Sequence, residues 1–175
     1  MLRPALVTFG ALAFITGLAY PLASVGIGHA AFRSQAEGSL MRQGGCVQGS
    51  RLVARPTEDP RDFWGRLPGG ANLSPGHPAL KERAEARIAA LRALDPGNAA
   101  PIPVDLVTGS ASDLDPHISP AAAEYQIARV ARLRNANVDA IRTLVRKHTT
   151  NRTLGFIGEP TVNVLELNLD LEAGR

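Results

Sequence analysis

The sequence is poor in cysteine and in aromatic residues. Only Cys46 is a cysteine among the 175 residues, so no disulfide can form within the chain and no cysteine cluster can hold zinc. Aromatic residues make up 5% of the chain although 45% of it is hydrophobic, which predicts a core of alanine, valine, leucine and isoleucine. The four histidines, at positions 29, 77, 117 and 148, lack the short spacing of a metal motif. We therefore expect neither a redox site nor a metal site.

Charged residues are absent between Arg3 and Arg33. This stretch reads PALVTFGALAFITGLAYPLASVGIGHAAF, 29 uncharged residues in a row, whereas about 20 apolar residues are enough to cross the hydrocarbon core of a bilayer. The pattern predicts a single transmembrane anchor at residues 1–32. A secretory signal peptide, cleaved after the small residues at 28–30, is the alternative. Such a signal has an apolar region of only about 7 to 15 residues and a charged leader, so we favour the span.

Small residues recur along this stretch. Gly10, Ala13, Gly17 and Ser24 are spaced by 3, 4 and 7 residues, so they share one face of an α-helix. Faces of this kind let a second helix approach closely in a membrane. We expect a partner helix there, although small residues are also simply common in membrane helices.

The arginines that flank the anchor bear on its orientation. Arg33, Arg42 and Arg51 follow the apolar stretch, while only Arg3 precedes it. The positive-inside rule therefore favours a cytoplasmic location for the carboxyl-terminal part.

Residues 33–175 are expected to form one small soluble domain of mixed helices and strands, an α+β domain behind the anchor. Apolar residues with helical spacing predict helices from Ala79 to Asp95, from Pro120 to Arg134 after a Ser119 cap, and after an Asn137 cap. Alternating or apolar runs predict strands at 46–56, 104–108, 154–158 and 162–171. Basic residues gather between positions 120 and 152 without interleaved aromatics, so nucleic acid is not an expected partner.

The loop in PVDLVTGSASDLDPHISP, residues 103–120, is crowded with polar residues. Ser110 or Ser112, with His117 and Asp115, would supply the residue types of a hydrolase. Partners this close in sequence rarely form a triad, and the chain has no GxSxG motif. Serine and aspartate also bond backbone amides in ordinary turns. The chain has no GxxxxGK[ST] or GxGxxG motif for a nucleotide either.

Several ordered segments resemble one family. These are LRPAL and ITGLAYPL in the apolar stretch, then GSRL, FWGR, GGANL, PVDLVTGSASDLDPHISPAAA, QIARVARLR and GEPTVNVLELNLDL. Together they are similar to KdpC, the C subunits of the bacterial Kdp potassium-transporting P-type ATPases, over nearly the whole chain.

The resemblance implies a single-span accessory subunit without bond chemistry of its own. It implies a place in the inner membrane beside lipid, a potassium-translocating subunit and an ATP-hydrolysing subunit whose ATP affinity it raises in a transient ternary complex. It also implies that the soluble domain lies on the outer face of the membrane. This is the opposite of the cytoplasmic location that the positive-inside rule favours. The loop TGSASDLD matches a region likened to a nucleotide-transporter signature motif, which makes Thr108, Ser110, Ser112 and Asp115 candidates for a nucleotide-affinity or partner loop. The alternative is a membrane-anchored serine hydrolase that uses Ser112 and His117.

Three departures from the family pattern stand out. The family's GSxLIGQ reads GSRLVAR here, with Ala54 and Arg55 in place of a glycine and a glutamine. The usual SGLD reads SDLD, with Asp113 in place of a glycine that has more backbone freedom. The segment between Arg66 and Gly69 is also shorter than in the family.

Overall fold

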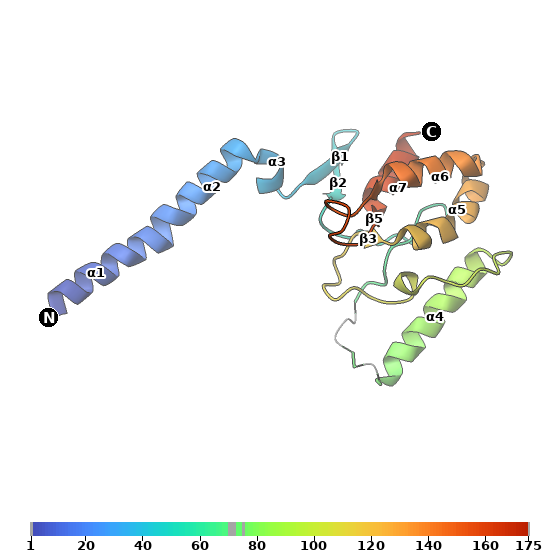
Figure 1. Ribbon diagram of the computed structural model, residues 1–175, viewed down its shortest axis with the longest axis horizontal. Coiled ribbons are helices and arrows are strands. Elements are labelled where there is room, and N and C mark those ends of the chain that lie inside the picture. Colours follow the sequence, from blue (N-terminus) through green and yellow to red (C-terminus); the bar gives the residue numbers. More distant parts are fainter. Residues whose placement is uncertain (1, 70–72, 75, 175) are drawn as a thin grey trace.

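The chain consists of two parts that differ in packing. The computed structural model describes residues 2–69, 73–74 and 76–174, so that residues 70–72 of the GGANL motif lie outside the described residues. A long amino-terminal helix extends away from a small domain in which helices pack around short strands (Figure 1). An apolar helix followed by one α+β domain is the fold class that the sequence predicts, and it is confirmed.

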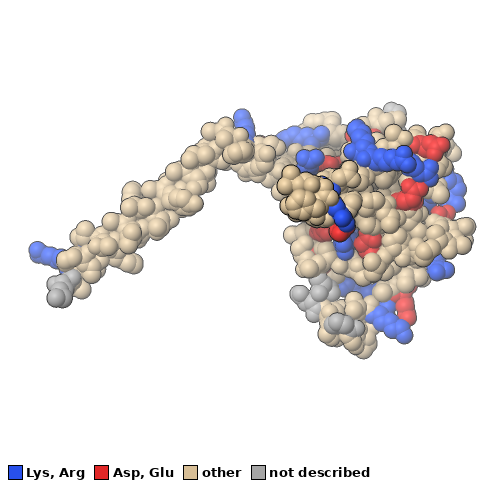
Figure 2. All heavy atoms as spheres, in the orientation of Figure 1, with Lys and Arg blue, Asp and Glu red and all other residues tan. Residues whose placement is uncertain are grey.

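The apolar stretch forms one helix from Leu2 to Ala31, made of α1 (Leu2–Phe14), a π-helical turn (Ile15–Ala19) and α2 (Tyr20–Ala31). Thirty residues of helix measure about 45 Å, more than the roughly 30 Å hydrocarbon core of a bilayer. None of the apolar window is buried against the domain, and charged residues lie only near its two ends (Figure 2). The helix is therefore long and apolar enough to cross a membrane.

A short helix and a hairpin connect this helix to the domain. After α3 (Arg33–Ala36), β1 (Leu40–Gln43) and β2 (Cys46–Ser50) pair antiparallel. Gly44 and Gly45 form the turn with φ of +58° and +82°, which suits a tight two-residue hairpin turn. The predicted strand at 46–56 is thus confirmed only over its first five residues, because the chain turns after Ser50.

The three predicted helices are confirmed with their caps. They are α4 (Pro78–Leu94), α5 (Pro120–Arg134) and α6 (Val138–Lys147). The Ser119 hydroxyl accepts a hydrogen bond from the amide of Ala122 at 3.1 Å, and the Asn137 side chain accepts one from Asp139 at 2.7 Å. Each bond satisfies an amide that the first helical turn leaves without a partner.

The closing segment shows that the prediction of a long strand at 162–171 is wrong. Only β5 (Thr161–Asn163) is extended, and α7 (Val164–Ala173) follows it directly. The Asn163 side chain accepts a hydrogen bond from the amide of Glu166 at 3.1 Å and so starts the helix. In this helix Val164, Leu167 and Leu171 are buried. They are spaced by 3 and 4 residues, so they share one face of the helix.

Two other predicted strands are also wrong. Residues 104–108 contain the 3-10 turn η2 (Val104–Leu106), which buries Leu106 and Asp105. Residues 154–158 form an exposed turn, closed by an isolated bridge between Thr153 and Ile157. A short apolar run is compatible with a strand and also with a turn, so the sequence pattern alone does not tell the two apart.

A three-stranded antiparallel sheet lies at the centre of the domain. It has the order β3 (His117–Ile118), β5, β4 (Thr149–Thr150). Helices α5, α6 and α7 contribute most of the core around it. Among the described residues, the connected core cluster consists of Phe63, Trp64, Leu91, Leu106, Ile118, Ala122, Ala123, Ile127, Val130, Ala131, Ile141, Val145, Val162, Val164, Leu167 and Leu171.

Candidate functional site

The Phe63–Trp64 pair anchors the irregular chain beside the candidate loop. The Gln126 side chain of α5 bonds both the amide and the carbonyl of Trp64, at 2.8 and 3.0 Å. The Asn168 side chain of α7 does the same for Phe63, at 2.9 and 3.0 Å. Since all four residues are buried, unpaired backbone groups there would be costly. Two amide side chains therefore fix the path of this segment.

Two arginines lie over the ring of Trp64. The guanidinium of Arg87 is 4.4 Å from the ring centroid and that of Arg129 is 5.9 Å from it. Arg87 also donates hydrogen bonds to the carbonyls of Leu106 and Gly65, at 3.1 and 3.0 Å. Burial lowers the pKa of Arg129 to about 10, a value at which the side chain still carries its charge at neutral pH. Through its two hydrogen bonds, Arg87 ties Leu106, just before the loop Thr108–Asp115, to the FWGR segment.

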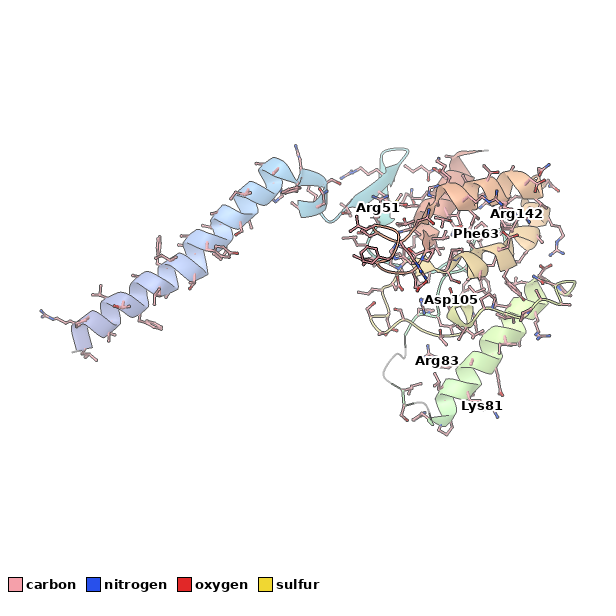
Figure 3. All side chains as sticks on the ribbon, in the orientation of Figure 1. Arg51, Phe63, Lys81, Arg83, Asp105 and Arg142 are labelled. Carbon is pink, nitrogen blue, oxygen red and sulfur yellow. The ribbon has the colours of Figure 1, made fainter. Side chains whose placement is uncertain are left out.

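The candidate loop, Thr108–Asp115, runs between η2 and β3. Asp105, just before it, is buried and accepts a hydrogen bond from the amide of Ser119 at 2.7 Å. Figure 3 shows Asp105 and Phe63 within the domain, whereas Lys81 and Arg142 lie toward its outer edges. On the other side, Gly109 forms an isolated parallel bridge with Leu67. Both ends of the loop are therefore held by the core.

The polar side chains of the loop bond mainly to the loop itself. The hydroxyls of Ser110 and Ser112 lie 3.5 Å apart, and they accept hydrogen bonds from the amides of Asp115 and Leu114 at 3.4 and 3.3 Å. Thr108 instead donates to the carbonyl of Val104 at 2.9 Å. The structure thus brings Ser110, Ser112 and Asp115 together, and it places Thr108 on the preceding turn.

The carboxylate of Asp115 contacts two side chains, those of Arg66 and His117. One oxygen lies 3.3 Å from Arg66 Nε, and the other accepts a hydrogen bond from the amide of His117 at 3.0 Å and lies 3.1 Å from its Nδ1. Sequence reasoning missed Arg66 because it lies in a different segment of the chain, and nothing in the residue spacing reveals that contact. Within the described ranges, no hydrogen bond joins Ser112 to His117, so the arrangement of a nucleophile and its base is not formed.

The cavity under the loop is small. It measures about 20 Å³ and is bordered by Arg55, Arg66, Ser110, Asp113 and Asp115 among others. That volume suits about one water molecule, whereas pockets for drug-sized or cofactor-sized ligands measure about 300 to 1,000 Å³. In this conformation the exposed side of the loop, residues 111–114, is the part that can contact a larger partner.

A larger hollow lies elsewhere, along α5. It measures about 860 Å³ and is mostly apolar, with Tyr125, Ile102 and Pro103 among its lining residues. Its one arginine, Arg132, lies 3.0 Å from Asp95. Because that cation already has an acidic partner, the groove offers no evident site for a triphosphate.

Comparison with known proteins identifies the family. The family described as "KdpC: K+-transporting ATPase, c chain" matches residues 2–173. The chain belongs to the KdpC family. It is 54% identical to the potassium-transporting ATPase KdpC subunit of Ralstonia nicotianae, over 98% of this chain and 90% of the relative. It is 53% identical to that of Sorangium cellulosum (99% and 98%) and 49% identical to that of Methylococcus capsulatus (99% and 97%).

Two departures from the KdpC pattern now have structural explanations. Asp113, in place of a glycine, has φ of +59°, the left-handed conformation that glycine adopts readily and that aspartate tolerates better than most residues. The loop therefore keeps a glycine-like turn and gains an exposed carboxylate. Arg55, in place of a glutamine, is exposed and donates a hydrogen bond to the side chain of Gln48 in β2 at 3.0 Å.

The small-residue face of the amino-terminal helix stays a prediction. Gly10, Ala13, Gly17 and Ser24 are all exposed, and no atom outside the helix lies within 4 Å of a Cβ built on Gly10 or Gly17. The π-helical turn, residues 15–19, contains Gly17 and precedes Pro21, which has no amide hydrogen to donate within the helix. Because a π turn changes the residue spacing, Ser24 is rotated relative to the straight stripe that the sequence predicts.

Proposed function

We propose that this chain is the accessory subunit of a potassium-transporting ATPase complex, without bond chemistry of its own. Its role is to stabilise the complex and to raise the affinity of the ATP-hydrolysing subunit for ATP. The observation that carries the proposal is the match to the KdpC family over residues 2–173, with relatives aligned along almost their full length.

The geometry of the candidate loop supports a binding role over catalysis. Ser110, Ser112 and Asp115 bond groups within the loop or next to it, and the cavity beneath them has room for about one water molecule. The exposed part, residues 111–114, presents the carboxylate of Asp113. We infer that this part contacts a protein subunit, and that any contact with ATP occurs only transiently in a ternary complex.

The proposed route to ATP affinity is indirect. With the helix Leu2–Ala31 spanning the inner membrane and the domain on its outer face, the domain braces the potassium-translocating subunit. The small-residue face of the helix packs against partner helices. Cytoplasmic ATP is then reached only through the assembled complex, which agrees with the small size of the loop cavity.

Omission and loop variants test this role. The ATP-hydrolysing and potassium-translocating subunits are purified with and without this chain, and ATPase activity is measured against ATP concentration. We expect the KM for ATP to rise severalfold without the chain. Joint replacement of Ser112→Ala and Asp113→Asn should weaken co-purification, whereas Ala89→Ser on the exposed face of α4 should not. An unchanged KM and unchanged assembly in every case would refute the proposal.

The side of the membrane is tested separately. Alkaline phosphatase and green fluorescent protein are each fused to the carboxyl terminus and measured in intact cells with membrane fractionation. Phosphatase activity in the membrane fraction places the domain outside and leaves bracing as the mechanism. Fluorescence without phosphatase activity would place it inside, as the arginines after the helix favour, and would make the candidate loop a candidate for nucleotide contact.

A further inference from the structure

The loop between β4 and β5 exposes three large apolar side chains together. Leu154, Phe156 and Ile157 are 79%, 73% and 52% exposed, and we call them the apolar tip. Single exposed apolar residues are ordinary, but a cluster that projects from a surface marks a contact with another apolar phase. This tip takes no part in the core or in the candidate loop.

The apolar tip is held in place by its own backbone. Thr153 and Ile157 exchange two amide-to-carbonyl hydrogen bonds, at 2.9 and 3.0 Å. Arg152 and Glu159 pair at 2.8 Å across the base of the loop. Leu154 itself has φ of +55°, a conformation that is unfavourable for a leucine and that turns its side chain outward. The backbone hydrogen bonds therefore close the turn, and the three side chains project from it into solvent.

The tether of the domain brings the apolar tip near the bilayer. The connection from Ala31 to β1 at Leu40 is so short that it can span at most about 30 Å even when fully extended. In Figure 1 the loop that precedes β5 lies on the side of the domain nearest the long helix, and the same place in Figure 2 is an uncharged knob. Phe32, Leu40 and Val47, along the connection and the hairpin, are exposed as well.

The loop that carries the apolar tip has no net charge, which favours contact with lipid over contact with a charged protein surface. Arg152 and Glu159 are the only charged residues from 151 to 160, and they neutralise each other. A convex, rigid and neutral tip needs no complementary pocket to enter a lipid interface. We propose that the apolar tip is a second membrane contact, in which Leu154, Phe156 and Ile157 enter the interfacial layer of the bilayer beside the anchor. Together with the anchor it fixes the orientation of the domain.

A fluorescent probe at the tip tests this contact. In a Cys46→Ser background, an environment-sensitive fluorophore is attached to Phe156→Cys or, as a matched control, to Ala89→Cys on the exposed face of α4. The full chain is placed in vesicles of phosphatidylcholine, with or without phosphatidylglycerol. We expect blue-shifted emission and severalfold stronger quenching by spin-labelled acyl chains at position 156. Because the loop is neutral, the anionic lipid and added salt should change neither result.

Equal emission and quenching at positions 156 and 89 would overturn the proposal. Burial of the probe only after the other complex subunits are added would also overturn it, in favour of a protein contact. The lipid vesicles contain no partner subunit, so a failure here leaves the proposed accessory role untouched.

A second variant measures the consequence for the domain. Leu154→Ser, Phe156→Ser and Ile157→Ser are combined, and the anisotropy of a fluorophore on the native Cys46 is compared with that of the unchanged chain in vesicles. We expect lower anisotropy because a domain without its second contact rotates more freely. The three residues are exposed, so the urea midpoint should stay unchanged. Unchanged anisotropy would contradict the proposal.

Discussion

Two loops of this domain use polarity in opposite ways. The candidate loop, Thr108–Asp115, is rich in serine and aspartate, yet Ser110 is buried and its hydroxyl bonds the amide of Asp115. The loop that carries the apolar tip, Thr153–Gly158, has leucine, phenylalanine and isoleucine facing outward. Both are held by short-range hydrogen bonds.

The difference shows that residue type alone does not identify a functional surface. The polar groups of the candidate loop are largely satisfied within the fold, so they maintain its shape. The apolar groups of the other loop are exposed and take no part in the core, which is why we propose a contact for them outside the domain. The inward or outward direction of each side chain is therefore what separates scaffold from contact surface.

The largest expected difference in the free energy of unfolding is between replacing a buried leucine and replacing an exposed one. Leu167→Ala should lower the free energy of unfolding by about 2 to 5 kcal/mol, because the side chain is fully buried and its removal leaves a cavity. Leu154→Ala, in the apolar tip, should change it by less than about 0.5 kcal/mol. Urea unfolding of the full chain in detergent measures both. Similar losses would show that the tip packs against the domain.

An effect of similar size is expected from polar groups that face inward. Gln126→Leu removes the partners of the Trp64 amide and carbonyl, and each unpaired buried group costs about 1 to 3 kcal/mol. Ser112→Ala, at an exposed position of the candidate loop, should cost less than about 1 kcal/mol. The same unfolding measurement applies. If Ser112→Ala were the more harmful change, the candidate loop would be essential to the fold itself.

The smallest effect concerns the pH dependence of an exposed turn. A hydrogen bond from the Arg61 side chain lowers the pKa of Asp59 from its usual 3.8 to about 2. Because the folded value lies below the unfolded one, Asp59 stabilises the fold above about pH 4, and this contribution is lost as the pH falls toward about 2. Asp59→Asn should flatten the stability profile slightly in that window. A profile identical to that of the unchanged chain would show that solvent screens the pair completely.

Much of the fold follows from local sequence patterns. The apolar stretch and the three helices, with Ser119 and Asn137 as caps, were all predictable. The closing helix was missed although Asn163 and Glu166 have the spacing of a helix start, because the leucine alternation through Leu171 suggested a strand. A short segment can satisfy two periodicities, and only its packing partners decide between them.

The candidate site was predictable in its residues but not in its contacts. Sequence reasoning selected Ser110, Ser112 and Asp115, which the structure brings together. It did not find Arg66 beside Asp115, and it took Leu154 to be part of a strand. Contacts between distant segments have no local signal, so they could not be read from spacing.

By itself, the sequence determined the apolar amino-terminal helix, the positions of the capped helices and membership of the KdpC family, because hydrophobic period, capping chemistry and ordered motifs are local properties of the chain. Only the tertiary structure decided that the Ser110 hydroxyl of the candidate loop is buried and bonded within the loop, whereas the apolar tip points outward. The reason is physical: whether a side chain is satisfied depends on partners far away in the sequence, which folding brings within hydrogen-bonding or van der Waals distance.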